Sequence, residues 1–161
     1  MTCIKNRSNF PYILQQDPLW CILASIENVM KYHRPTTNIT QTQIFQQYTA
    51  QNPFNTISFN RISQVLRTNY SQYWNFDPRQ WQTNNQFVDY VENCIRNNNP
   101  VIISMRLPGR TGAHMFTVLC INSRFFRIFD TGYLPTWINL DKNFILNNLS
   151  PQRGTLLITP I

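Results

Sequence analysis

The sequence predicts an α+β fold of one domain, residues 1–161, in which N-terminal helices pack on a C-terminal antiparallel β-sheet. Two observations lead to this prediction. Up to residue 96 the apolar residues recur mainly at the three- and four-residue spacing of amphipathic helices. From residue 100 they gather instead in short β-prone runs separated by turns. Helices followed by strands are typical of α+β architecture rather than of alternating βαβ units.

The individual elements follow from caps, breakers and periodicity. The first helix begins at residue 19 or 20, because Pro18 disfavours helix in the residue before it, and it ends at residues 33–35. Three more helices are expected, one from Thr40 or Thr42 to residue 48, one from Ser58 onward and one over residues 84–96. Strands are expected over residues 100–106, 114–121, 125–130 and 155–161, and residues 10–14 and 70–76 are expected to be extended.

Composition and charge narrow the class of protein. Hydrophobic residues make up 42% of the 161 residues, which is enough for one core and argues against disorder. The formal net charge is +7, yet the arginines are scattered and form no basic run. We therefore expect a monomer with a basic surface and no specific nucleic-acid binding. Its expected partner is a protein or peptide substrate, and the charge favours an acidic one.

The four cysteines show no CxxC pair and no Cys/His spacing typical of a metal site, so neither a metal nor a cofactor is expected. They also do not form the pattern of a disulfide framework. Cys94 and Cys120 lie in apolar segments, where buried free thiols are the ordinary interpretation. Because the N-terminus lacks the apolar core of a signal peptide, we expect a soluble protein that is cytoplasmic or is delivered into a target cell by a specialised secretion system.

Cys21 is the candidate nucleophile. It lies at the predicted start of the first helix, where free backbone N–H groups and the helix dipole favour a negatively charged thiolate. Gln15 precedes it by six residues, and its side-chain amide together with the Cys21 backbone N–H is expected to form an oxyanion hole.

His114 is the candidate base. It opens one predicted strand, and Asp130 closes the next. If these strands form a hairpin that turns near residues 122–123, both side chains lie at its open end, and the carboxylate orients the imidazole. His33, the other histidine, is expected at the far end of the helix of Cys21, about three turns away.

Residues 15–32, QQDPLWCILASIENVMKY, resemble the Gln-x5-Cys-x-x-Ala-Ser signature of papain-like cysteine peptidases. The likeness is greatest with the compact bacterial branch that includes bacteriocin-leader-processing peptidases and AvrRpt2-like effector proteases. In those families a histidine opens a later strand and an Asp or Asn follows at the end of the next, as in GAHMFTVLCINSRFFRIFD. The resemblance implies a papain-like fold with Cys21, His114 and Asp130 as the catalytic residues and Gln15 in the oxyanion hole.

Three functions fit these residues. The leading hypothesis is a cysteine protease or isopeptidase that forms a thioester acyl-enzyme, in the setting of a bacterial effector or toxin domain. The second is a papain-like protein glutamine deamidase, or an acyltransferase of the transglutaminase kind. The third is an inactive binding module, against which the presence of all three candidate catalytic residues argues.

Overall fold

The computed structural model describes residues 1–54, 57–109, 112–133 and 135–161. Within these ranges seven strands form one antiparallel sheet in the order β2–β7–β3–β4–β5–β6, and β1 pairs with β4 outside this path. The strands are β1 Thr2–Cys3, β2 Trp74–Arg79, β3 Val101–Met105, β4 His114–Ile121, β5 Phe125–Phe129, β6 Trp137–Asp141 and β7 Thr155–Pro160. The helices are the short 3₁₀ helix η1 Arg7–Asn9, α1 Cys21–His33, α2 Gln41–Thr49, α3 Phe59–Tyr70, α4 Asn84–Arg96 and α5 Lys142–Asn147. The predicted α+β fold is confirmed.

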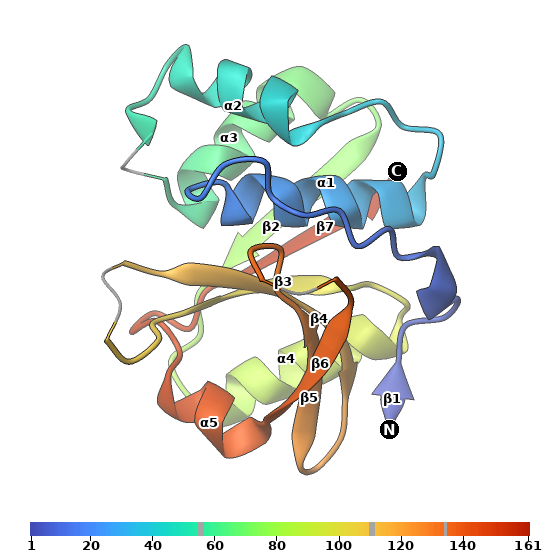
Figure 1. The fold of residues 1–161 in the computed structure, drawn as a ribbon, viewed down its shortest axis with the longest axis vertical. Helices are drawn as coiled ribbons and strands as arrows, with labels where there is room; N and C mark the ends of the chain where they lie inside the picture. The colour runs from blue at the N-terminus through green and yellow to red at the C-terminus, as the bar shows by residue number, and fades with distance from the viewer. Residues whose placement is uncertain (55–56, 110–111, 134) are drawn as a thin grey trace.

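Helices cover both faces of the sheet (Figure 1). α1 packs against β3, β4 and β7, whereas α4 packs against β1, β3 and β4. α2 contacts both α1 and α3, and α3 covers β2, so these three helices form one cluster on the same side of the sheet. α5 lies beside β5 and β6. The helix that carries Cys21 therefore lies directly against the strand that begins with His114.

The side chains of β3 show how one strand serves two cores. Ile102 belongs to the core beneath α1, whereas Val101 and Ile103 belong to the core beneath α4. Successive side chains of a strand point to opposite faces, so a strand covered on both faces buries its residues on both sides and is mainly apolar. All five residues of β3 are accordingly buried.

Several predicted boundaries are confirmed. Thr40 and Ser58 accept hydrogen bonds from backbone N–H groups in the first turns of α2 and α3. α4 spans residues 84–96 and β4 spans residues 114–121, as the sequence predicts. α1 begins at Cys21, one or two residues later than expected. Within the part of the chain that the structure describes, no helix is both long and apolar enough to cross a membrane.

Other expectations about local structure are wrong. Residues 10–14 are not extended throughout, since Tyr12 has a positive φ of 54°. An amide side chain of α1 holds this segment: Ile13 N–H donates to Asn28 Oδ1 (2.7 Å), and Asn28 Nδ2 donates to Ile13 O (2.8 Å). Residues 70–76 are only partly extended, since α3 continues to Tyr70 and β2 begins at Trp74. β6 and α5 were not predicted. β6 is an edge strand with a half-exposed, weak apolar pattern.

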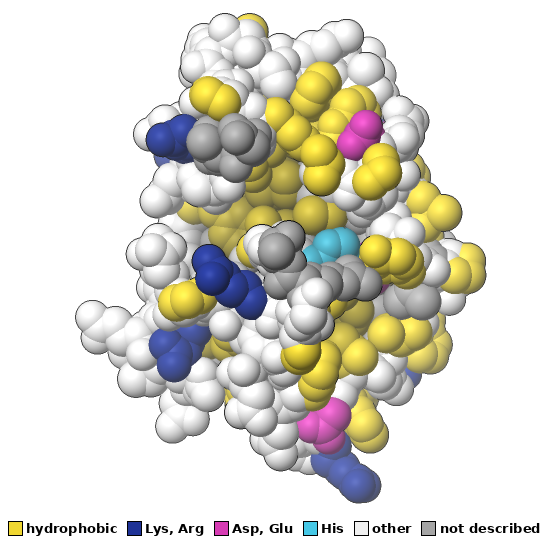
Figure 2. Space-filling view, turned by 60° about the vertical axis from the view of Figure 1, so that its left-hand side comes forward, with side chains coloured by type: hydrophobic (Ala, Val, Ile, Leu, Met, Phe, Trp, Pro, Cys, Tyr) yellow, Lys and Arg dark blue, Asp and Glu magenta, His cyan; other side chains and the backbone are white. Residues whose placement is uncertain are grey.

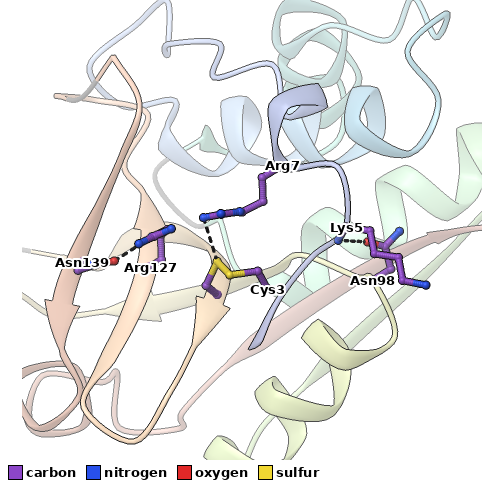
Figure 3. Close-up of a disulfide and its surroundings, with 7 residues drawn as sticks. Cys3, Lys5, Arg7, Asn98, Arg127 and Asn139 are labelled. Atoms are coloured by element: carbon purple, nitrogen blue, oxygen red, sulfur yellow. Dashed lines mark hydrogen bonds between the residues drawn. A yellow bond between two sulfur atoms is a disulfide. The ribbon is translucent and has the colours of Figure 1, made fainter. Parts of the chain in front are cut away.

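Cys120 is not a free thiol, contrary to the sequence-based expectation. It forms a disulfide with Cys3, and the two residues lie directly opposite each other in the β1–β4 pair (Figure 3). Arg7 Nη1 lies 3.6 Å from Cys120 Sγ and covers the bridge. β1 has only two residues, which is too short for a periodic pattern. The sequence therefore did not predict that β1 pairs with β4 and brings the two sulfur atoms together. The expectation of a buried free thiol at Cys94 is confirmed.

Candidate active site

Cys21 is the first residue of α1, and the turn before it sets its position. Asp17 holds this turn through two hydrogen bonds: its Oδ1 accepts from Leu19 N–H (2.9 Å), and its backbone oxygen accepts from Trp20 N–H (3.0 Å). The first N–H groups of a helix have no partner within the helix. The half-exposed free thiol of Cys21 therefore lies where the helix favours negative charge.

His114 and Asp130 meet at the open end of the β4–β5 hairpin. β4 begins at His114, and Asp130 directly follows β5. His114 Nε2 lies 2.8 Å from Asp130 Oδ1, and only 15% and 11% of the two side chains are exposed. The same carboxylate oxygen accepts a hydrogen bond of 2.9 Å from Gly132 N–H. Asp130 is thus fixed from a second side while it orients the imidazole.

Cys21 and His114 line the same pocket, and Cys21 is close enough to the imidazole to act on its pKa. Because Nε2 is occupied by Asp130, Nδ1 is the ring nitrogen left to face the sulfur. Burial alone lowers the pKa of His114. The hydrogen bonds and negative charges of Asp130 and Cys21 outweigh burial and raise the pKa to about 9. These interactions thus favour the protonated, imidazolium form of His114.

Gln15 lies beside Cys21, but its amide is engaged with protein groups. Its Nε2 donates to the carbonyl oxygens of Asp17 (3.1 Å) and Pro18 (2.9 Å). Its Oε1 accepts a hydrogen bond of 2.9 Å from Thr131 Oγ1. Both amide protons therefore point at the turn before α1 in this structure, and the Gln15 side chain joins that turn to the loop after β5.

One pocket of about 550 Å³ brings these groups together, and we call it the nucleophile pocket. Gln15, Cys21 and His114 line it, along with Leu19, Ala113 and Gly132. Asp130 lies behind the imidazole and does not line the pocket. Figure 2 shows a histidine side chain at the edge of a hollow lined by hydrophobic side chains.

His33 takes no part in this arrangement. It ends α1, twelve residues after Cys21, which corresponds to about 18 Å along a helix axis. Burial, with a smaller effect from Arg34, lowers the pKa of His33 to about 4, so its ring is neutral at neutral pH. Within the described ranges, no three His, Cys, Asp or Glu side chains gather closely enough to hold a metal ion.

Two further residues of the site were not singled out from the sequence. Thr131 bonds the Gln15 side chain, and its backbone oxygen accepts from Gln15 N–H (3.0 Å). Gly132 leaves room for the same side chain, because a Cβ at this position would lie 3.2 Å from Gln15 Oε1. A Thr-Gly pair at the end of a strand is typical of a turn, and sequence alone shows no link from it to residue 15.

The helical layer against an antiparallel sheet, with the cysteine at the start of the central helix, defines the class: the chain has the fold of papain-like cysteine peptidases. The model of the Peptidase C39-like family matches residues 7–147, and the chain belongs to this family. This confirms the resemblance to papain-like cysteine peptidases and gives no support for the AvrRpt2-like branch.

Solved structures show the same fold at low sequence identity. A candidate C39-like peptidase from Bacillus anthracis superposes with a TM-score of 0.74 at 9% identity, covering 99% of this chain and 98% of that one. The peptidase domain of Streptococcus ComA, a bi-functional ABC transporter involved in quorum sensing, has a TM-score of 0.67 at 14% identity, with coverage of 92% and 97%. A double glycine motif protease from an AMS/PCAT transporter, solved in complex with the leader peptide, has a TM-score of 0.67 at 12% identity, with coverage of 100% and 99%. No curated protein sequence matches the chain significantly.

Proposed function

We propose that this protein is a cysteine peptidase that cleaves peptide bonds through a thioester on Cys21. The observation that carries the proposal is the continuous chain of contacts from Cys21 through His114 to Asp130. It combines the three parts that thiol catalysis needs: a nucleophile, a proton carrier and a group that orients the carrier. The family of the chain supports the same class of reaction.

The reaction has two halves. The Cys21 thiolate attacks the carbonyl carbon of the peptide bond, a C–S bond forms, and the electron pair of the carbonyl moves onto its oxygen. When the C–N bond breaks, His114 gives its proton to the departing amine, which leaves a neutral imidazole and a thioester. Water then attacks the thioester while His114 takes one of its protons. The acid product leaves, and the thiolate–imidazolium pair is restored.

The carbonyl oxygen of the substrate becomes negatively charged during the attack, and in this proposal hydrogen-bond donors on the Gln15 side of the pocket stabilise it. The Cys21 backbone N–H supplies one, because the first residue of a helix has no intrahelical acceptor. Gln15 supplies the second by turning one N–H away from Pro18 O, where it points in the free protein. Gln15 therefore acts twice in this proposal, as a brace for the turn and as a donor in the transition state.

The substrate in this proposal is a protein or peptide segment in an extended conformation. A related fold was solved as a protease bound to a leader peptide, which supports a peptide substrate here. All side chains of the proposed site come from one chain, so a monomer suffices for the reaction.

The test uses mass spectrometry with detection of new N-termini. Wild type, Cys21→Ala and Cys94→Ala are each incubated with a proteome-derived peptide library at neutral pH. We expect new N-termini with wild type and with Cys94→Ala, the matched control, but none with Cys21→Ala. Glutamine converted to glutamate without chain cleavage, in a manner that depends on Cys21, would instead identify the protein as a deamidase.

A further inference from the structure

A second pocket, of about 320 Å³, opens beside the nucleophile pocket and shares Ala113 with it; we call it the side pocket. It lies between the start of α3, the end of β3 and the start of β7, and Phe59, Arg79, Arg106 and Met115 are among its lining residues. We infer that the side pocket selects an acidic side chain of the peptide substrate, with Arg106 as the residue that recognises the carboxylate. This inference rests on the proposed peptidase function.

The charge of the side pocket points to this ligand. Its described lining contains two arginines, Arg79 and Arg106, and no carboxylate. Arg79 is already neutralised, because its Nε lies 3.0 Å from Asp77 Oδ2. Arg106 forms no ion pair with any carboxylate of the described residues. The described lining of the side pocket thus carries one positive charge, on Arg106, that no described carboxylate compensates. In Figure 2, Lys and Arg side chains border the hydrophobic hollow on one side.

The position of Arg106 relative to His114 is fixed by the sheet. Met105 lies directly opposite His114 in the β3–β4 ladder, so Arg106 is the next residue beyond this pair. Arg106 N–H donates to Asn148 O (2.8 Å), which holds its backbone at the end of β3. Residues paired across an antiparallel ladder lie about 5 Å apart. An extended substrate at Cys21, which advances about 3.3 Å per residue, therefore reaches Arg106 within a few residues of the bond under attack.

The walls of the side pocket suit the rest of such a side chain. Phe59 and Met115 offer apolar surface to its methylene groups. The hydroxyls of Ser104 and Ser150 bond each other at 2.7 Å and are already partnered. A glutamate side chain fits this pocket, because its methylene groups can pack on the apolar wall while its carboxylate pairs with Arg106.

The test separates binding from cleavage. A displayed library of random dodecapeptides is selected on the Cys21→Ala protein, and on this protein carrying either Arg106→Glu or Arg124→Glu. Arg124 is an exposed residue at the β4–β5 turn, which is the opposite end of the hairpin from His114. Arg124→Glu therefore changes the net charge of the protein by the same amount as Arg106→Glu but leaves the side pocket intact. Selected peptides are then resynthesised with Glu, Gln or Lys at the enriched position, and their affinities are measured.

We expect enrichment of Glu or Asp at one position and a loss of about fivefold in affinity when it is replaced by Gln. Arg106→Glu should reverse the preference toward Lys, whereas Arg124→Glu should retain it. An absence of acidic enrichment, or an enrichment that Arg106→Glu leaves unchanged, would overturn the inference. Wild-type protein that cleaves Glu and Gln peptides equally well would also overturn it while leaving the peptidase function intact. Charge-dependent binding of peptides that wild type never cleaves would support the inference as a binding site and contradict the peptidase function.

Discussion

Thr131 Oγ1 donates a hydrogen bond of 2.9 Å to Gln15 Oε1, across 116 residues of sequence. Thr131 directly follows Asp130, the partner of His114, and Gln15 braces the turn that leads into Cys21. Together with the backbone hydrogen bond from Gln15 N–H to Thr131 O, this contact joins the loop that orients the histidine to the loop that positions the thiol. A substitution that displaces either loop should therefore change the positions of both Cys21 and His114 in the nucleophile pocket.

Thr131→Val tests this connection, because valine has nearly the same shape and lacks the donor. The substitution leaves Gln15 Oε1 without its partner and frees the amide to rotate. We expect kcat/KM to fall about tenfold, which corresponds to the roughly 1.4 kcal/mol of one hydrogen bond. Thr131→Ser, which keeps the hydroxyl, is the control and should stay close to wild type. Wild-type kinetics for Thr131→Val, alongside a large loss in Gln15→Ala, would show that Gln15 needs no such support.

The pH dependence of activity tests His114 and Asp130 together. In the proposed reaction the protonated imidazole donates to the leaving amine, and the pKa of His114 is raised to about 9. We expect kcat/KM to be maintained through neutral pH and to fall as the pH rises through about 9. Asp130→Asn keeps a hydrogen-bond acceptor but removes the negative charge, so the alkaline limb should move to lower pH. An alkaline limb at the same pH in wild type and Asp130→Asn would contradict this role of the carboxylate.

The same pKa shift predicts a pH-dependent contribution to folding stability. The folded-state pKa of His114 lies above its ordinary value of 6.5, so the folded protein binds the proton more tightly than the unfolded chain. The stabilisation is therefore fully present below about pH 6.5 and is lost as the pH rises through about 9. Urea unfolding of wild type and His114→Ala at several pH values measures it, and the difference between the two should shrink across this window. A constant difference would contradict the pKa shift.

Thiol labelling distinguishes the two free cysteines. Burial raises the pKa of Cys94 to about 11, so its reactive thiolate is scarce at neutral pH. Cys21 is half exposed and faces the His114 side chain. With iodoacetamide at pH 7.5 we expect Cys21 to be alkylated at least about 100-fold faster than Cys94, as followed by peptide mass spectrometry. His114→Ala should slow labelling of Cys21 and leave Cys94 unchanged. Comparable rates at the two thiols in wild type would argue against an activated Cys21.

The Cys3–Cys120 disulfide closes a loop with a sequence separation of 117 residues. Cross-links of this kind stabilise mainly by restricting the unfolded chain, typically by about 2–4 kcal/mol. Reduction, or the Cys3→Ser substitution, should lower the urea midpoint accordingly, while the pH profile of activity stays unchanged because the bridge lies at the far end of β4 from His114. An unchanged midpoint on reduction would indicate that the bridge does not form. Disulfides persist mainly in oxidising environments, so its presence would favour action outside a reducing cytosol.

The local parts of this protein were largely predictable. The helix of residues 84–96 and the strand of residues 114–121 were found with their observed bounds, because a strong periodic pattern and a clear cap or turn mark each of them. The meeting of His114 and Asp130 was also predictable, since a hairpin brings residues at its two open ends together. β1 and β6 were not, because a two-residue strand has no period and an exposed edge strand buries little apolar surface.

The sequence alone therefore determined the order of elements, the α+β class and the position of each candidate catalytic residue on its own element. Only the tertiary structure decided which distant residues touch: Cys3 with Cys120, Thr131 with Gln15, and the Gln15 amide with the carbonyl of Pro18. It also placed Arg106, which forms no ion pair among the residues that the structure describes, beside the pocket of Cys21. Elements form from patterns between near neighbours, which a sequence displays directly. Contacts between residues more than a hundred positions apart depend on how the sheet and helices pack. Local sequence patterns do not predict that packing.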